Sequence, residues 1–74
     1  MKLKNVKINE LYIWQDSTII TIDKVINVNN NFIQAKVIKS ISGDFQTSEI
    51  TNYGIDFFCR NWRELTPLEK VKYL

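Results

Sequence analysis

The sequence predicts a mainly β protein: a small antiparallel barrel or curled meander of four to five strands with a short C-terminal helix. Two observations predict the sheet, namely β-branched runs of alternating polarity and the short polar turns that separate them. A third observation predicts the helix, because apolar residues recur at helical spacing near the end of the chain. With 74 residues, we expect a single domain over residues 1–74, with the helix from about residue 66.

Residues 7–14 are predicted to form the first strand, with Leu11 and Ile13 on one face and Tyr12 and Trp14 on the other. Which of the two pairs faces solvent stays open. A polar turn at residues 15–17 leads into a second strand that is rich in β-branched residues. Its alternation slips near Asp23, which predicts a β-bulge there.

Residues 31–40 alternate apolar and polar side chains and predict a third strand. The asparagine-rich segment 27–31 predicts the turn of a hairpin between the second and third strands, because asparagine tolerates left-handed conformations. We expect a further turn at residues 42–44 and a fourth strand over residues 45–51 that is broken at residues 52–54.

The segment after residue 54 allows two interpretations. Phe58, Trp62 and Leu65 are spaced by four and three residues, which places them on one face of a helix. The same segment is also compatible with a short helical turn followed by a fifth strand at residues 62–65.

The start of the C-terminal helix is predicted from three side chains. Thr66 is a suitable N-cap, Pro67 suits the first helical position, and Glu69 stands where a capping box needs an acid. We expect the helix to dock on the body with its apolar side chains inward and its lysines outward: Leu68, Val71 and Leu74 inward, Lys70 and Lys72 outward.

The order of short strands and the closing segment Phe58-Cys59-Arg60-Asn61-Trp62-Arg63-Glu64-Leu65 resembles SH3-like small β-barrels of phage and mobile-element type. The other matching segments are Leu11 to Trp14, Ile19 to Ile26 and Ile33 to Ile38, so the resemblance spans most of residues 6 to 65. The chain departs from the pattern at residues 9–12, where the glycine-aromatic signature is missing. The resemblance implies binding rather than catalysis, because such barrels mostly grip peptides, proteins or nucleic acids.

Most catalytic chemistry is excluded by residue type. The chain has one cysteine and no histidine, so it forms no intrachain disulfide and no Cys–His or Ser–His nucleophile pair. The acids lack the spacing of a cation site, and two glycines cannot build a phosphate-binding loop of the usual kind. We therefore predict no enzyme, no catalytic residue, no metal site and no cofactor.

Cys59 is the one candidate nucleophile. If Asp56 caps a helix that starts near Phe57, Cys59 lies in the first turn, where a helix N-terminus lowers a thiol pKa. Free cysteine is also among the most buried residue types. The sequence therefore favours Cys59 as a small core residue.

The candidate partner-binding residues are aromatic and basic. Exposed tyrosine and tryptophan are favoured anchors at protein interfaces and stacking platforms for single-stranded nucleic acid, and basic side chains contact phosphates or acidic protein surfaces. The predicted set is Tyr12, Trp14, Lys36, Lys39, Arg60 and Arg63. Alternatively, the tryptophans fill the core and the basic residues are ordinary solvated side chains.

Three function classes remain, all without catalysis. The leading hypothesis is a phage-encoded inhibitor that occludes a host protein or defence complex, of anti-CRISPR or anti-restriction type. The alternatives are an accessory nucleic-acid-binding module, for which a net charge of +2 is only mild support, and an oligomer that sequesters a nucleotide signal. Isoleucine, asparagine and lysine make up 27 of 74 residues, which suggests an AT-rich genome such as many bacteria and phages have.

We expect a cytoplasmic location, in the bacterial host cell if the protein is phage-encoded. The basic N-terminus lacks the apolar run of a signal peptide, and no apolar run is long enough to span a membrane. A protein partner is the leading expectation, nucleic acid the second, and the oligomeric state stays open.

Overall fold

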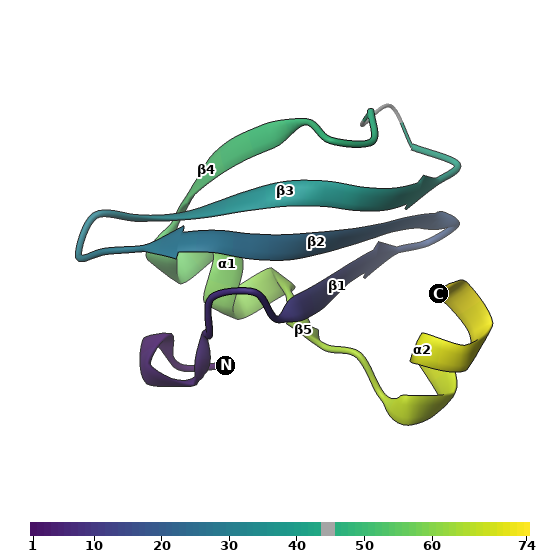
Figure 1. Cartoon of the computed structure of the whole chain (residues 1–74), viewed down its shortest axis with the longest axis horizontal. Helices are drawn as coiled ribbons and strands as arrows, with labels where there is room; N and C mark the ends of the chain where they lie inside the picture. The colour runs from purple at the N-terminus through teal and green to yellow at the C-terminus, as the bar shows by residue number, and fades with distance from the viewer. Residues whose placement is uncertain (44–45) are drawn as a thin grey trace.

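The computed structural model describes residues 1–43 and 46–74, and it contains one antiparallel sheet of five strands (Figure 1). The strands are β1 (Leu11–Asp16), β2 (Ile19–Val28), β3 (Phe32–Ile41), β4 (Ile50–Gly54) and β5 (Arg63–Glu64). Their order is β4-β3-β2-β1-β5, so β4 and β5 form the two edges. The predicted mainly β meander is confirmed. The alternative prediction, a closed barrel, is wrong because the two edge strands do not pair with each other.

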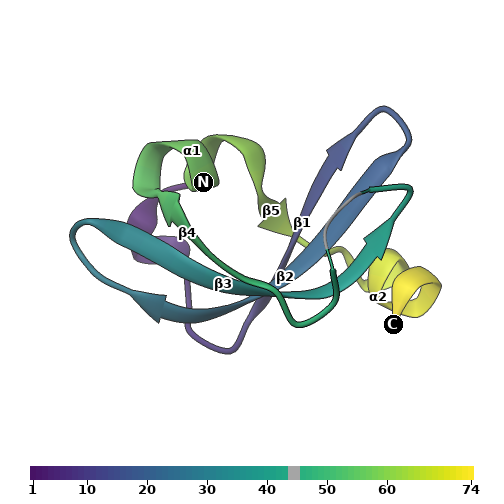
Figure 2. The ribbon, with the colours of Figure 1, turned by 90° about the horizontal axis from the view of Figure 1, so that it is seen from above.

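Two short α-helices pack on opposite faces of the twisted sheet, as Figure 2 shows. Helix α1 (Ile55–Asn61) lies over the concave face, and α2 (Pro67–Tyr73) lies against the convex face. A single 3₁₀ turn, η1 (Leu3–Asn5), precedes β1. No described helix is long and apolar enough to cross a membrane.

The predicted hairpin between β2 and β3 is confirmed, and its turn is built on an asparagine. The side-chain Oδ1 of Asn29 accepts hydrogen bonds from the backbone N–H groups of Asn31 (2.7 Å) and Phe32 (2.9 Å). This is the local bonding that makes asparagine a good turn residue. A second hairpin joins β1 to β2 by a tight turn in which Ser17 has a φ of 55°.

The register irregularity predicted near Asp23 is also confirmed, although the extra residue lies on the neighbouring strand. Ile22 pairs with Lys39 and Asp23 pairs with Val37, so Ile38 of β3 is the bulged residue. Bulges increase the local twist of a strand pair. This bulge adds to the curvature that lets α1 sit in the concave face.

The segment after β3 differs in part from the prediction. The fourth strand covers Ile50–Gly54 rather than residues 45–51, so residues 52–54 continue the strand instead of breaking it. The predicted positions at Asp44 and Phe45 lie outside the described residues. Of the two interpretations of the next segment, the structure matches the helical turn followed by a fifth strand.

Two apolar clusters hold the layers together. The larger cluster lies between the concave face and α1, and its buried residues are Val6, Tyr12, Val25, Ile33, Ala35, Tyr53, Phe58 and Trp62. The smaller cluster on the convex face contains Ile13, Ile22 and Leu65, with Tyr73 of α2 packed against it. Because β1 is covered on both sides, neither of its two side-chain pairs lies fully open to solvent.

Candidate protein-binding surface

Tyr12, the first predicted aromatic anchor, is part of the core. Its side chain is 0% exposed, and its ring packs edge-on against Phe58, with 5.7 Å between centroids and 74° between planes. Its hydroxyl accepts a hydrogen bond from the backbone N–H of Lys7 (2.9 Å) and donates one to the carbonyl of Asn5 (3.2 Å). Tyr12 therefore ties η1 to the sheet and is not an exposed anchor, which corrects the prediction.

Trp14 keeps some exposed surface. It is half-buried and stacks on Trp62, with 5.7 Å between ring centroids and 23° between planes. Trp62 itself is 4% exposed and lies between Trp14, Phe58 and Tyr53. The core interpretation thus holds for Trp62, while Trp14 rests on the outside of the same aromatic cluster.

The four predicted basic residues do not form one patch. Arg60 is exposed on α1, the helix that covers the concave face. Lys36 and Lys39 stand on the convex face, and Lys24 pairs directly with Lys36 across β2 and β3. We call Lys24, Lys36 and Lys39 the lysine face. Lys24 was not among the residues predicted from the sequence. Lys24 is two residues after Ile22 on the predicted second strand, so the two side chains share a face, and this spacing could have placed Lys24 on the convex face.

Lys39 also has a structural role. Its Nζ donates a hydrogen bond to the backbone carbonyl of Tyr73 at 2.7 Å, in the last turn of α2. The last carbonyls of a helix have no partner within the helix and carry partial negative charge, so a lysine stabilises them. Lys39 therefore helps to hold α2 against the sheet.

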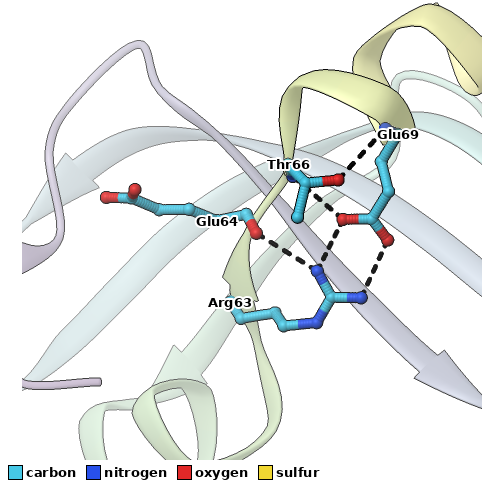
Figure 3. Close-up of polar contacts among 4 residues, drawn as sticks. All are labelled: Arg63, Glu64, Thr66 and Glu69. Atoms are coloured by element: carbon cyan, nitrogen blue, oxygen red, sulfur yellow. Dashed lines mark hydrogen bonds and ion pairs between the residues drawn. The ribbon is translucent and has the colours of Figure 1, made fainter.

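Arg63 is occupied by an ion pair with α2. Figure 3 shows its guanidinium bound to both carboxylate oxygens of Glu69, at 2.6 and 2.8 Å. Glu69 also accepts a hydrogen bond from the backbone N–H of Thr66 (2.9 Å), and the Thr66 hydroxyl accepts one from the N–H of Glu69 (3.2 Å). The predicted capping box is therefore confirmed. Hydrogen bonds from Arg63 and Thr66 lower the pKa of Glu69 to about 2.

These contacts fix the side of α2 that faces the body. Glu69 and Tyr73 are one helical turn apart, so they share a face. Glu69 binds Arg63, and Tyr73 packs against the cluster that contains Ile13 and Ile22. The polar and aromatic side of the helix is thus the docked side.

The opposite side of α2 is apolar and exposed. Leu68 is 76% exposed, Val71 82% and Leu74 59%, and we call these three residues the α2 stripe. The prediction that they point inward is wrong, because the docked positions are already taken by Glu69 and Tyr73. The orientation of α2 is set by the ion pair between Arg63 and Glu69. The spacing of apolar residues along a helix does not predict such a contact with another segment.

Asp23 is a buried carboxyl group in the middle of the sheet. It is 0% exposed and lies under the aromatic cluster, where the Tyr53 hydroxyl donates a long hydrogen bond to it at 3.5 Å. The indole N–H of Trp62 lies near the carboxyl group and has no hydrogen-bond partner among the described residues. Burial raises the pKa of Asp23 to about 6, and Trp62 and Tyr53 offset part of that rise.

Cys59 packs against the larger cluster and is half-buried. Burial raises the pKa of its thiol, and the N-terminal amine only partly offsets this. Helix α1 begins at Ile55 with Gly54 as N-cap, so Asp56 is not the cap and Cys59 is not in the first turn. The geometry therefore matches a core residue rather than an activated nucleophile.

A pocket of about 380 Å³ lies between the N-terminal segment and β5, lined by Met1, Asn5, Lys7, Arg63 and Glu64. Its lining mixes both signs of charge, and Arg63 is already bound to Glu69. Among residues 1–43 and 46–74, no three acids or cysteines gather in a way that could hold a metal ion. Comparison of the chain with protein-family models, curated proteins and solved structures found no match.

Proposed function

We propose that this protein is a small non-enzymatic binding protein that attaches to another protein through the α2 stripe. One observation carries the proposal: three apolar side chains on one helix face are between 59% and 82% exposed, while the polar face of the same helix is docked. A protein that used α2 only to complete its core would be expected to bury the apolar face. A helix that lays apolar residues into a partner's groove uses this i, i+3 spacing.

The way α2 is held supports the same function. The capping box, the Arg63–Glu69 pair and the Lys39 hydrogen bond fix the orientation of the helix before any partner arrives. Pre-organisation reduces the conformational entropy that binding costs. The stripe is therefore presented as a rigid ridge.

Charge indicates the chemistry of the partner. Lys70 and Lys72 are exposed on either side of the α2 stripe, and the one acid of the helix, Glu69, is bound to Arg63. An apolar groove with an acidic rim complements this arrangement. A second copy fits less well, because stripe-to-stripe packing would bring the lysines of both copies together.

The small size and the composition of the chain favour one kind of binding protein, a phage-encoded inhibitor that occludes a host protein or defence complex. A ridge without catalytic groups acts by covering a site or blocking an assembly step. The anti-CRISPR or anti-restriction type belongs to this proposal and rests on no individual residue.

The experiment has two stages. A tagged protein is first used to recover partners from bacterial lysate with nuclease present, and the recovered partner is then titrated with variants. Leu68→Gln with Val71→Gln should weaken binding at least tenfold. Ile8→Gln is the matched control, because Ile8 is 52% exposed and lies outside α2. Equal affinity of the stripe variant and the wild type would refute the proposed site.

A nucleic-acid-binding function is the second candidate, and the lysine face favours it. Lys24 and Lys36 are directly opposite each other, and like charges in this position destabilise a sheet unless an anion compensates them. Phosphate binding loses affinity steeply as salt rises, whereas apolar docking does not. Recovery of nucleic acid alone from a parallel lysate without nuclease, with affinity that falls on changing Lys24 and Lys36 to glutamine, would support this candidate instead.

A further inference from the structure

The two edges of the sheet differ in how they are protected. The β5 edge is two residues long and both are charged, Arg63 and Glu64. The β4 edge is five residues long and contains no charge and no proline. Natural proteins usually blunt exposed edges with charged residues, prolines or very short strands, because an open edge pairs with other strands. In this molecule β5 follows that rule and β4 does not.

The register of β4 shows which backbone groups are open. The N–H of Val37 bonds to the carbonyl of Glu49 (2.8 Å), and the N–H of Ser48 bonds to the carbonyl of Val37 (2.7 Å). Bonding alternates along an antiparallel pair, so Thr51 and Tyr53 are the next residues to bond to β3. The backbone N–H and C=O groups of Ile50 and Asn52 therefore point away from the sheet.

Apolar side chains stand on both sides of this open edge. Ile50 is 54% exposed on the convex side. Phe57 of α1 is 53% exposed and stacks on Tyr53 of β4, with 6.2 Å between ring centroids. Because the side chains of a strand alternate between its faces, an added strand would meet Ile50 with one set and Phe57 with the other.

We infer that β4 accepts an extended peptide segment of a partner protein as a sixth strand. The segment would carry small or β-branched apolar side chains in its middle and basic residues at its ends. Exposed acids flank the edge, with Glu49 before β4 and Asp56 just after it, and a basic residue at each end of the peptide complements them.

The same charges argue against a second copy of this chain as the occupant. In an antiparallel pair of two β4 strands, the start of one strand meets the end of the other. Glu49 of one copy would then approach Asp56 of the second copy, and the like charges would repel.

The test uses a synthetic peptide as probe, lysine-threonine-valine-valine-valine-threonine-lysine, followed by NMR of the backbone amides. We expect saturable shifts at Ile50, Asn52 and Gly54 and slower hydrogen exchange at the first two. A peptide with N-methyl groups on the edge-facing amides should bind at least tenfold more weakly. A peptide with glutamate at both ends should bind several-fold more weakly.

Protein variants give the matched control. Asn52→Pro removes one outward N–H and leaves the bonds of Thr51 and Tyr53 to β3 in place, so peptide affinity should fall at least tenfold. Asn52→Ala removes only the side-chain hydrogen bond from Gln34 (3.0 Å) and should retain binding. Should Asn52→Pro fail to fold, the N-methylated peptide on wild-type protein still decides the question.

Three results would overturn the inference. They are equal binding of the N-methylated peptide, amide shifts that map to α2 instead of β4, and β4 shifts that depend on protein concentration without peptide, which would identify a second copy as the occupant. The variant Leu68→Gln with Val71→Gln should still bind the peptide. The test of the β4 edge can therefore fail or succeed independently of the test of the α2 stripe.

Discussion

The buried carboxyl group of Asp23 makes the stability of this protein depend on pH in an unusual direction. Burial raises the pKa of Asp23 from its ordinary value of 3.8 to about 6 in the folded protein. The folded state therefore binds the proton more tightly than the unfolded state. The resulting stability is fully present below pH 3.8 and is lost as pH rises through about 6.

The size of the effect follows from the two pKa values. A tenfold change in proton affinity corresponds to about 1.4 kcal/mol, so a rise from 3.8 to about 6 amounts to about 3 kcal/mol in total. From pH about 4.5 to about 7.5, the free energy of unfolding should fall by about 2 kcal/mol. Glu69 acts in the opposite sense at lower pH, because its folded pKa is lowered to about 2 and its contribution is lost as pH falls.

The assay is urea unfolding followed by tryptophan fluorescence at a series of pH values. Asp23→Asn cannot titrate at this position, so its stability should be nearly flat in this range. Its stability relative to wild type should therefore improve by about 2 kcal/mol as pH rises from about 4.5 to about 7.5. Asp16→Asn, at an exposed carboxyl group on β1, should keep the wild-type slope because Asp23 is still present.

One result would refute this reasoning. If wild type and Asp23→Asn run parallel between these pH values, the carboxyl group keeps the same proton affinity when the chain unfolds. Asp23 would then be in contact with water in the folded protein, and its burial under Tyr53 and Trp62 would be incorrect.

Three further changes test the packing. Phe58→Ala should destabilise the protein by about 3–5 kcal/mol in urea unfolding, because the ring is 0% exposed. Phe57→Ala, at an exposed ring, should cost less than about 1 kcal/mol. Equal losses of stability in the two variants would contradict the assignment of Phe58 to the core. Glu69→Ala removes the side-chain half of the capping box and the ion pair with Arg63, and it should cost about 1 kcal/mol, with faster amide exchange in α2; unchanged exchange would show that these Glu69 bonds do not hold the helix. Tyr12→Phe should cost about 1 kcal/mol and speed exchange of the Lys7 amide, and protection equal to wild type would exclude the hydroxyl as its acceptor.

Local sequence was sufficient where the cause of the structure is local. The hairpin at Asn29 follows from an asparagine that bonds the N–H groups two and three residues ahead, and the start of α2 follows from Thr66 and Glu69. The alternation along β2 also placed the irregularity beside Asp23. The turn at Asn29 and the start of α2 depend on residues that are close in sequence, so spacing alone predicts them.

The bounds of the fourth strand could not be predicted from local sequence. Asn52 and Gly54 are poor strand formers, so the sequence predicts a break where the structure continues β4. Pairing with residues 32–36 of β3 overrides this preference. Propensity gave the right kind of element and the wrong boundaries.

The candidate site was predicted only in part. Lys36 and Lys39 do share a face, but Arg63 is bound by Glu69, and Tyr12 is covered by Phe58, 46 positions further along the chain. Alternation along a strand says which residues share a face. It does not say which face another element will cover.

The sequence by itself determined the first three strands, the turn between β2 and β3 and the capped helix at the end of the chain, because alternation, turn residues and caps are patterns among near neighbours. Only the tertiary structure decided that β1 is covered on both faces, that Asp23 is enclosed, and that α2 docks through Glu69 and Tyr73 with its apolar side outward. Those outcomes depend on contacts between distant segments. The exposed stripe, which carries the proposed function, is a consequence of that docking.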